Sequence, residues 1–219
     1  MSMLAMVHFL PVTSLLATLP QLFQQLNWLE VFGFMTGALC VYLQVKEIIW
    51  NWPIGIVNNI VYFVVFWRSR IYADACLQLF FLSVSTYGWW QWKYGGTQRP
   101  ELSVQRTTRR LGLRLAAITI TAGLLIHEAL RRFSNSDVPW GDATTTAISL
   151  TAQYMLGRKL LENWILWIAV NVLYLGLYCY KRLFLTAFLY MIFNGLCVMG
   201  YRGWSASLRR DRIAKAVPA

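Results

Sequence analysis

The sequence predicts an all-α integral membrane protein with seven transmembrane helices, arranged as two parallel three-helix bundles joined by a linker helix. Three observations support this prediction. Hydrophobic residues make up 58% of the 219 residues and the mean hydropathy is +0.47, more than one soluble core of this size requires. Several windows of 18 or more residues carry almost no charge and are long enough to cross a bilayer. The third observation is an internal repeat.

The repeat emerges when the chain is aligned with itself, without a gap, so that Asn51 falls on Asn163. Residues 51–92 and 163–204 are then identical at eleven of 42 positions, where composition alone gives roughly 3 or 4, so a structural unit is duplicated. A unit of three consecutive membrane-spanning helices ends on the side of the membrane opposite to its start. A second copy in the same orientation therefore needs one extra helix, which predicts an order of three plus one plus three.

Each segment of the chain has a predicted place in this plan. Residues 1–27 carry no Lys, Arg, Asp or Glu, contain Pro11 and Pro20, and are expected to form an interfacial or partly inserted helix. Residues 28–92 form the first three-helix repeat, with spans at about 28–45, 53–67 and 72–92. The last of these ends in tryptophans that are typical of the headgroup zone.

The second half of the chain is interpreted in the same way. Residues 93–139 combine a polar, basic loop with the linker helix, at about 111–130, which has no counterpart in the repeat. Residues 140–204 form the second three-helix repeat, with spans at about 140–156, 164–180 and 183–200. Residues 205–219 form a basic tail.

The net charge of +11 has a distribution that predicts orientation. On the side that holds the C-terminal tail there are 14 Lys and Arg residues, and on the other side 6. Positive charge is retained in the cytoplasm, so the tail of this multi-pass protein is expected to be cytoplasmic. The basic residues sit at span ends and in loops, which favours this interpretation over nucleic-acid binding.

Two stripes of amide and aromatic side chains occupy equivalent helices of the two repeats. Asn59 lies among aromatic residues spaced by three and four, and Asn171 does the same at the equivalent position of the second repeat. A buried amide in hydrocarbon costs several kcal/mol unless its hydrogen bonds are met, so each Asn must face protein, water or a ligand. Gln78 and Asn194 on the third helices are further candidates. The alternative is that these amides bond a neighbouring helix while Trp and Tyr act as interface anchors.

Several chemical features are absent from the sequence. No span centre holds a Lys, Arg, Asp or Glu for a proton relay, and no GxxxxGK[ST] loop for ATP is present. His127-Glu128 is half of an HExxH motif without its second His, and no nucleophile has a paired base. We therefore expect no enzyme, cofactor or metal, but a carrier for a polar solute, aromatic or glycosidic, that moves down its gradient. Stacked aromatic faces suit a flat, cationic ring.

Four motifs add a family resemblance: W-P at the start of the second span, Y-x-D-x-x-x-Q, Y-G-W-W-x-W and E-N-W-x-x-W. Together they resemble the PnuC family of nicotinamide riboside transporters, bacterial relatives of the SWEET sugar carriers, over most of 28–204. The resemblance implies facilitated diffusion of nicotinamide riboside, a form of vitamin B3 and a precursor of NAD, across the bacterial inner membrane. It also implies that a cytosolic kinase traps the solute and that the protein forms a homotrimer. The substrate-binding residues that it implies are Trp52, Asn59, Gln78, Trp164, Trp167, Asn171 and Asn194.

Other functions stay open at this point. Related carriers are expected to transport thiamine or riboflavin, and a sugar carrier of SWEET type would need no cationic ring. A non-transporting membrane sensor or enzyme is the alternative from another class.

Overall fold

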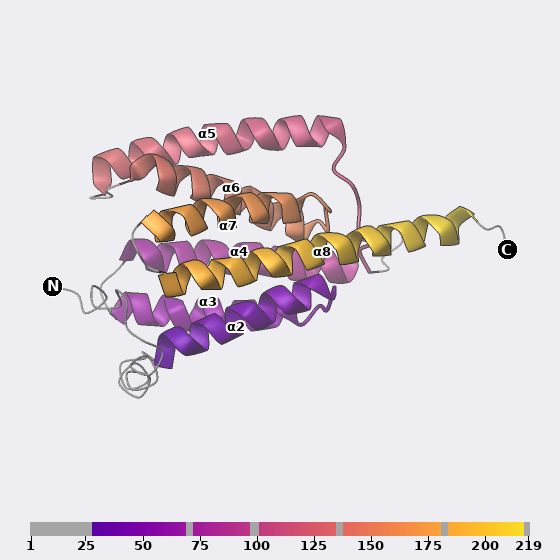
Figure 1. The fold of residues 1–219 in the computed structure, drawn as a ribbon, viewed down its shortest axis with the longest axis horizontal. Coiled ribbons are helices and arrows are strands. Elements are labelled where there is room, and N and C mark those ends of the chain that lie inside the picture. Colours follow the sequence, from indigo (N-terminus) through magenta and orange to yellow (C-terminus); the bar gives the residue numbers. More distant parts are fainter. Residues whose placement is uncertain (1–27, 69–71, 97–100, 135–137, 181–183, 217–219) are drawn as a thin grey trace, which may run out of the picture.

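The computed structural model describes residues 28–68, 72–96, 101–134, 138–180 and 184–216, and every element in them is an α-helix (Figure 1). The prediction of an all-helical chain with seven helices is confirmed for this part of the chain. Residues 1–27, expected to form an interfacial helix, lie outside the described residues. The helices are α2 (Trp28–Val45), α3 (Asn51–Arg68), α4 (Tyr72–Tyr94), α5 (Arg109–Phe133), α6 (Pro139–Gly157), α7 (Asn163–Tyr180) and α8 (Phe184–Ala216).

Six of the helices form a closed ring, and the seventh lies outside it. Within each half of the chain, consecutive helices pack together, α2 on α3 on α4 and α6 on α7 on α8. The ring closes because α2 also packs on α8 and α4 on α6. Among the described helices, α5 packs on α6 alone, and it lies at the edge of the molecule (Figure 1).

The local sequence explains where the helices begin. Pro139 occupies the first turn of α6, where the amide that proline lacks would have no partner. Thr108 caps α5 by accepting a hydrogen bond from the Leu111 amide. Helices α3 and α7 both start at a buried asparagine. The Nδ2 of Asn51 donates to the Ile48 carbonyl at 2.7 Å, and the Nδ2 of Asn163 donates to the Leu160 carbonyl at 2.6 Å.

The turns before α3 and α7 share an uncommon backbone conformation. Glu47 has φ 57° and Lys159 has φ 48°, so both adopt the left-handed region that non-glycine residues seldom enter. The two residues occupy equivalent positions of the two repeats. The repeat in the sequence is therefore a repeat in backbone geometry as well.

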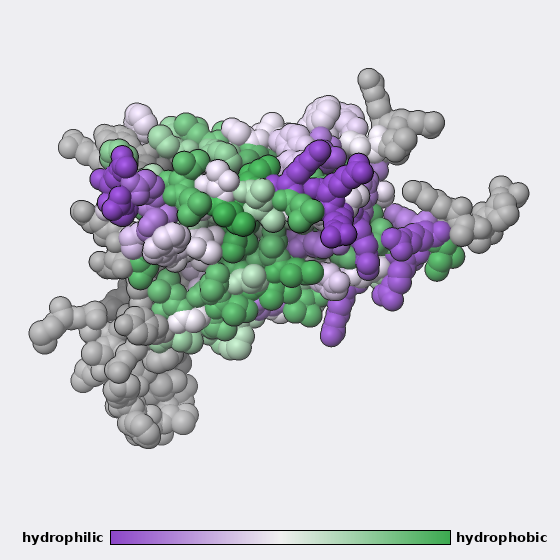
Figure 2. Space-filling model, turned by 90° about the horizontal axis from the view of Figure 1, so that it is seen from above, coloured by the Kyte–Doolittle hydropathy of each residue, from purple (hydrophilic) through white to green (hydrophobic). Residues whose placement is uncertain are grey.

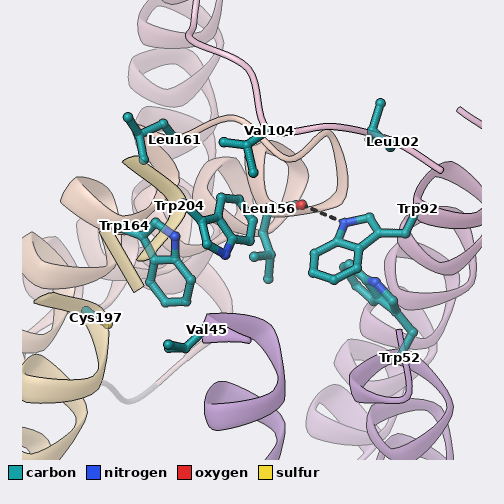
Figure 3. Packing of buried hydrophobic residues seen from close by; sticks show 10 residues of the cluster. All are labelled: Val45, Trp52, Trp92, Leu102, Val104, Leu156, Leu161, Trp164, Cys197 and Trp204. Atoms are coloured by element: carbon teal, nitrogen blue, oxygen red, sulfur yellow. Dashed lines mark hydrogen bonds between the residues drawn. The ribbon is translucent and has the colours of Figure 1, made fainter. Parts of the chain in front are cut away.

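Four tryptophans from the two halves meet at one end of the ring, in what we call the tryptophan cluster: Trp52, Trp92, Trp164 and Trp204 (Figure 3). Trp52 packs edge-on against Trp92 with ring centroids 5.5 Å apart, and Trp164 packs edge-on against Trp204 at 5.3 Å. The two pairs join where Trp92 lies 5.9 Å from Trp204. All four indoles are buried, so this cluster is the hydrophobic core shared by both halves.

Reciprocal polar contacts link the halves at the same end. The Nε1 of Trp92 donates to the Leu156 carbonyl of α6, and the Nε1 of Trp204 donates to the Gln44 carbonyl of α2, both at 3.0 Å. Lys159 pairs with Glu47 across the halves, with 2.9 Å between Nζ and Oε2, and its ammonium lies 4.5 Å from the Trp92 ring centroid. Each half therefore completes hydrogen bonds and charges of the other.

The basic loop that the sequence assigns to the linker is docked on the protein. Leu102 and Val104 are buried in the core, and Gln105 forms an isolated β-bridge with Leu160. Thr107 donates from its amide at 2.8 Å and from its hydroxyl at 2.6 Å to the Glu162 carboxylate. These contacts hold the start of α5 against the second half.

Helix α8 continues well past Gly200, the predicted end of the last span. Its extension is rich in Arg and Ala, which favour helix, and Tyr201 and Leu208 pack against the core. The tail expected at 205–219 is thus helical as far as Ala216.

The surface between the two ends of the molecule is apolar. Figure 2 shows a hydrophobic band across the middle, with hydrophilic residues gathered toward both ends. Helix α5 has 25 residues and an 18-residue window of mean hydropathy 1.5, so among the described helices it alone is long and apolar enough to cross a membrane by length and composition. Its Leu113, Ile120 and Leu125 are each at least 65% exposed. A surface of this kind suits contact with lipid.

Candidate functional site

A pocket of about 160 Å³ lies between the helices of the first half and reaches α6 of the second half. We call it the amide pocket, because carboxamide side chains and a hydroxyl line it. Its lining residues are Gly37, Cys40, Gln44, Asn51, Trp52, Gly55, Asn58, Asn59, Phe81, Ser85 and Gln153. Among the described residues, the lining contains no Lys, Arg, His, Asp or Glu, so recognition here relies on hydrogen bonds and ring faces.

Asn59 stands on α3 opposite Ser85 of α4. Its Nδ2 is 3.5 Å from the Ser85 Oγ, the outer limit for a hydrogen bond. An amide has two donors and an acceptor, so most of the hydrogen-bonding capacity of Asn59 is not used by this contact. The neighbouring Asn58 is held similarly loosely, by a 3.5 Å contact from the Thr36 hydroxyl to its Oδ1.

Trp52 forms the aromatic side of the amide pocket at the end near the tryptophan cluster. Its indole is buried, and its Nε1 has no hydrogen-bond partner among the described residues. Gly88 permits this position, because a Cβ there would overlap the Trp52 ring. Phe81 of α4 supplies a second ring to the lining.

The equivalent positions of the second half are packed more tightly. Asn171 is 7% exposed and its Nδ2 lies 3.6 Å from the Sγ of Cys197, the counterpart of Ser85. Trp164 is 1% exposed within the tryptophan cluster, and Trp167 packs against that cluster. Asn194 donates to the Tyr190 carbonyl at 3.2 Å, while its Oδ1 is buried without a partner among the described residues.

The structure therefore brings together two of the seven predicted site residues, Trp52 and Asn59, in the amide pocket. Gln78, which is half-buried, does not line the pocket, and neither do the four residues of the second half. Whether any of the seven contacts a solute stays a prediction.

Gln153 is the lining residue that sequence comparison of the repeats misses. Under the alignment that places Asn51 on Asn163, its counterpart is Val41, so no shared pattern identifies it. The available signal is a lone carboxamide within the otherwise weakly polar helix α6. Because Gln153 belongs to the second half while the other lining residues belong to the first, the amide pocket lies at the interface between the halves.

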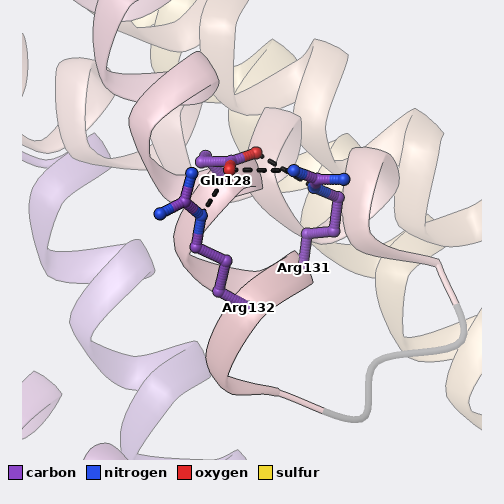
Figure 4. A network of polar contacts seen from close by, with 3 residues as sticks. All are labelled: Glu128, Arg131 and Arg132. Carbon is purple, nitrogen blue, oxygen red and sulfur yellow. Dashed lines mark hydrogen bonds and ion pairs between the residues drawn. The ribbon is translucent and has the colours of Figure 1, made fainter.

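The half-motif His127-Glu128 is used for structure in α5. The His127 ring stacks on Trp140 with centroids 3.8 Å apart. Glu128 pairs with Arg131 at 2.9 Å and with Arg132 on the helix surface (Figure 4). Among the residues that the structure describes, no three His, Cys, Asp or Glu side chains gather where a metal ion could bind.

Comparison with known proteins gives consistent matches. A family model described as nicotinamide mononucleotide transporter matches residues 27–206. The nicotinamide riboside transporter PnuC of Escherichia coli is 25% identical over 209 residues, covering 84% of this chain and 87% of its own. The riboflavin/roseoflavin transporter RibM of Streptomyces davaonensis is 27% identical over 193 residues, covering 86% and 89%.

A solved structure extends the likeness to three dimensions. The crystal structure of the vitamin B3 transporter PnuC matches with a TM-score of 0.67 and 25% identity, over 86% of this chain and 85% of that one. These relatives are named as transporters, not as enzymes. Since the family model covers most of the sequence, the chain belongs to the PnuC family of nicotinamide mononucleotide transporters, which implies a protein of the bacterial inner membrane.

Proposed function

We propose that this protein carries nicotinamide riboside into the cell by facilitated diffusion. The observation that carries the proposal is the composition of the amide pocket, which offers carboxamides, a hydroxyl and aromatic rings but no ionisable Lys, Arg, His, Asp or Glu. Ribose hydroxyls and a carboxamide match Asn59, Ser85 and Gln153. A pyridinium ring matches the faces of Trp52 and Phe81, which attract a flat cation.

The same composition supports transport without a coupled ion. A carrier driven by protons or by sodium usually places an ionisable group at depth, and the amide pocket has none. The gradient is then maintained by phosphorylation of the solute by a cytosolic kinase. A phosphate group would find no Arg or Lys in the lining, so the phosphorylated product would bind poorly and stay inside.

The pocket has to enlarge to hold a nucleoside. Its 160 Å³ is below the ~300–1,000 Å³ typical of small-molecule sites. Because Gln153 belongs to the second half, a rocking of one half against the other would widen the pocket. In such a state we propose that Gln78 and the second-half residues Trp164, Trp167, Asn171 and Asn194 complete the site begun by Trp52 and Asn59.

The proposed architecture has seven spans, with repeats at 28–92 and 140–204 and the linker helix within 93–139. The helix ring and the reciprocal contacts of Trp92 and Trp204 support two like halves in parallel orientation. The apolar band supports burial in the bilayer (Figure 2). The end with the tryptophan cluster and the C-terminal tail faces the cytoplasm in this proposal, and the protein assembles as a homotrimer.

Uptake of labelled nicotinamide riboside into liposomes, with and without a membrane potential, tests the proposal. We expect saturable uptake that stops when nicotinamide riboside reaches its equilibrium distribution across the membrane. An inside-negative potential should increase this uptake only by the amount that the positive charge of the solute requires. Uptake equal to that of protein-free liposomes would contradict it. The likeness to RibM favours riboflavin as the second candidate, so riboflavin, thiamine and glucose are tested as competitors.

Substitution of Asn59 by leucine tests the site. We expect Asn59→Leu to weaken binding of nicotinamide riboside by about 1–3 kcal/mol, because a buried polar group of the solute would lose its partner. Isothermal titration calorimetry of the purified protein measures the change. Gln91→Leu is the matched control, since Gln91 bonds the Tyr87 hydroxyl and does not line the pocket. Equal affinities of the two variants would remove Asn59 from the site. Asn171→Leu reports whether the second half takes part.

A further inference from the structure

A second and larger hollow, of about 370 Å³, lies at the end of the molecule where α8 projects beyond the other helices (Figure 1). We call it the basic pocket. Four arginines line it, Arg106 from the docked loop and Arg202, Arg209 and Arg212 from α8, together with Tyr201 and Ser205. It is separate from the amide pocket and shares no lining residue with it.

The α8 side of the basic pocket has no equivalent in the helix that α4 forms in the described part of the first half. Helix α4 ends at Tyr94, whereas α8 continues well beyond the equivalent position, Ala206, to Ala216. Arg209 and Arg212 lie on this extension, and Arg202 stands where the first half has Trp90. The duplicated architecture therefore does not account for the four arginines.

None of the four arginines forms an ion pair within the part of the chain that the structure describes. Two carboxylates near this end have other partners. Glu162 accepts both hydrogen bonds of Thr107, and Glu47 pairs with Lys159. At about 100° per residue, the lining positions of α8 cover an arc of roughly 120°, and Asp211 lies about 60° outside that arc. Four like charges around one hollow repel one another unless an anion joins them.

We propose that the basic pocket binds a phosphate group. Guanidinium groups present paired N–H donors that match the oxygens of a phosphate, and the hydroxyls of Tyr201 and Ser205 add neutral donors. The Nε of Arg209 donates to the Ser205 carbonyl at 3.3 Å, which leaves the two terminal nitrogens to bind an anion. The described lining residues include no carboxylate that would oppose such a ligand.

The phosphate has two sources, an anionic lipid headgroup or a soluble phosphate. Helix α8 is 33 residues long, or about 50 Å at 1.5 Å per residue, against about 30 Å of hydrocarbon. Its arginines begin shortly after Gly200, where the apolar part of the helix ends. This depth is that of headgroups, and it is also open to the aqueous phase, so the experiment includes both ligands.

The test compares two variants of the full-length, delipidated protein that lose the same charge. Arg209→Gln with Arg212→Gln removes two arginines of the basic pocket. Arg110→Gln with Arg210→Gln is the control, because both residues are exposed and neither lines the pocket. The shift of the thermal unfolding midpoint, followed by tryptophan fluorescence, is recorded against cardiolipin, phosphatidylglycerol or inorganic phosphate at constant ionic strength.

We expect the pocket variant to bind at least ~10-fold more weakly than wild type and the control to bind within about 2-fold, since each lost guanidinium removes charge-assisted hydrogen bonds. Binding of the lipids that inorganic phosphate does not displace would support the site with a lipid ligand. Binding of inorganic phosphate without lipid would support it with a soluble ligand. Equal weakening in both variants, or no shift in wild type with any of the three ligands, would overturn the proposal.

Discussion

Gly88→Ala is expected to destabilise the protein by about 2 kcal/mol through overpacking, although alanine favours helix over glycine. A Cβ at this position would overlap the Trp52 ring, and Trp92 packs against that ring and restrains it. Overpacking of this kind costs about 1–3 kcal/mol, and a large rigid ring lies at the upper end, while the helix propensity of alanine returns up to ~1 kcal/mol. Thermal and denaturant unfolding in detergent, followed by tryptophan fluorescence, measures the effect.

Gly176→Ala is the matched control for this substitution. Gly176 also lies within a helix, and a Cβ there would meet nothing within 4 Å. The control should therefore be neutral or slightly stabilising. Gly200→Ala should behave like Gly88→Ala, because its Cβ would come within 2.6 Å of the Trp164 ring. Equal stability of the Gly88 and Gly176 variants would show that Trp52 can move aside at little cost.

Glu47→Gln is expected to cost about 2–3 kcal/mol, because it leaves the ammonium of Lys159 buried without its counter-charge. The Lys159 side chain is 7% exposed, whereas Glu47 is 24% exposed. Breaking a buried pair costs ~3–5 kcal/mol, and the partial exposure of Glu47 and the face of Trp92 beneath the ammonium reduce this. The loss should appear as a lower unfolding midpoint.

The opposite substitution should be milder. Lys159→Met removes the more buried charge and leaves Glu47 partly in contact with water, so we expect a loss of about 1 kcal/mol. The exchange Glu47→Lys with Lys159→Glu keeps the pair and should recover part of the stability lost in either single charge reversal. A double-mutant cycle without coupling energy would show that the pair does not link the halves.

The sequence predicts the helices and the duplication well, because apolar composition and fixed spacing are properties of the chain itself. It predicts the lining of the amide pocket less fully, since Trp52 and Asn59 are the two predicted residues that line it. Identical positions in the two repeats, such as Asn51 and Asn163 or Trp92 and Trp204, donate hydrogen bonds to the turn before their own helix or to the other half of the core. Trp164 satisfies the same criterion and lies in the tryptophan cluster.

Comparison of the repeats identifies residues that both halves share. The amide pocket is lined by residues of the first half and by Gln153 of the second half, so its lining is not duplicated. Gln153 enters it from α6 against Val41 in the first half, so the comparison is blind to it. The left-handed backbone conformation at Glu47 and Lys159 is also not predictable from the sequence, because neither position is a glycine. The ion pair between the two side chains joins residues far apart in sequence, so it too has no local signal.

The Glu47–Lys159 pair also disfavours some assemblies of the two halves when they are separated. Two N-terminal halves joined in the same manner would bring two carboxylates to the shared axis, and two C-terminal halves would bring two ammonium groups. At a separation of about 3 Å such encounters repel, whereas the mixed combination attracts. When they are co-expressed as separate polypeptides, the halves should therefore form heterodimers rather than homodimers. In the natural chain, fusion through α5 supplies the two halves in equal numbers.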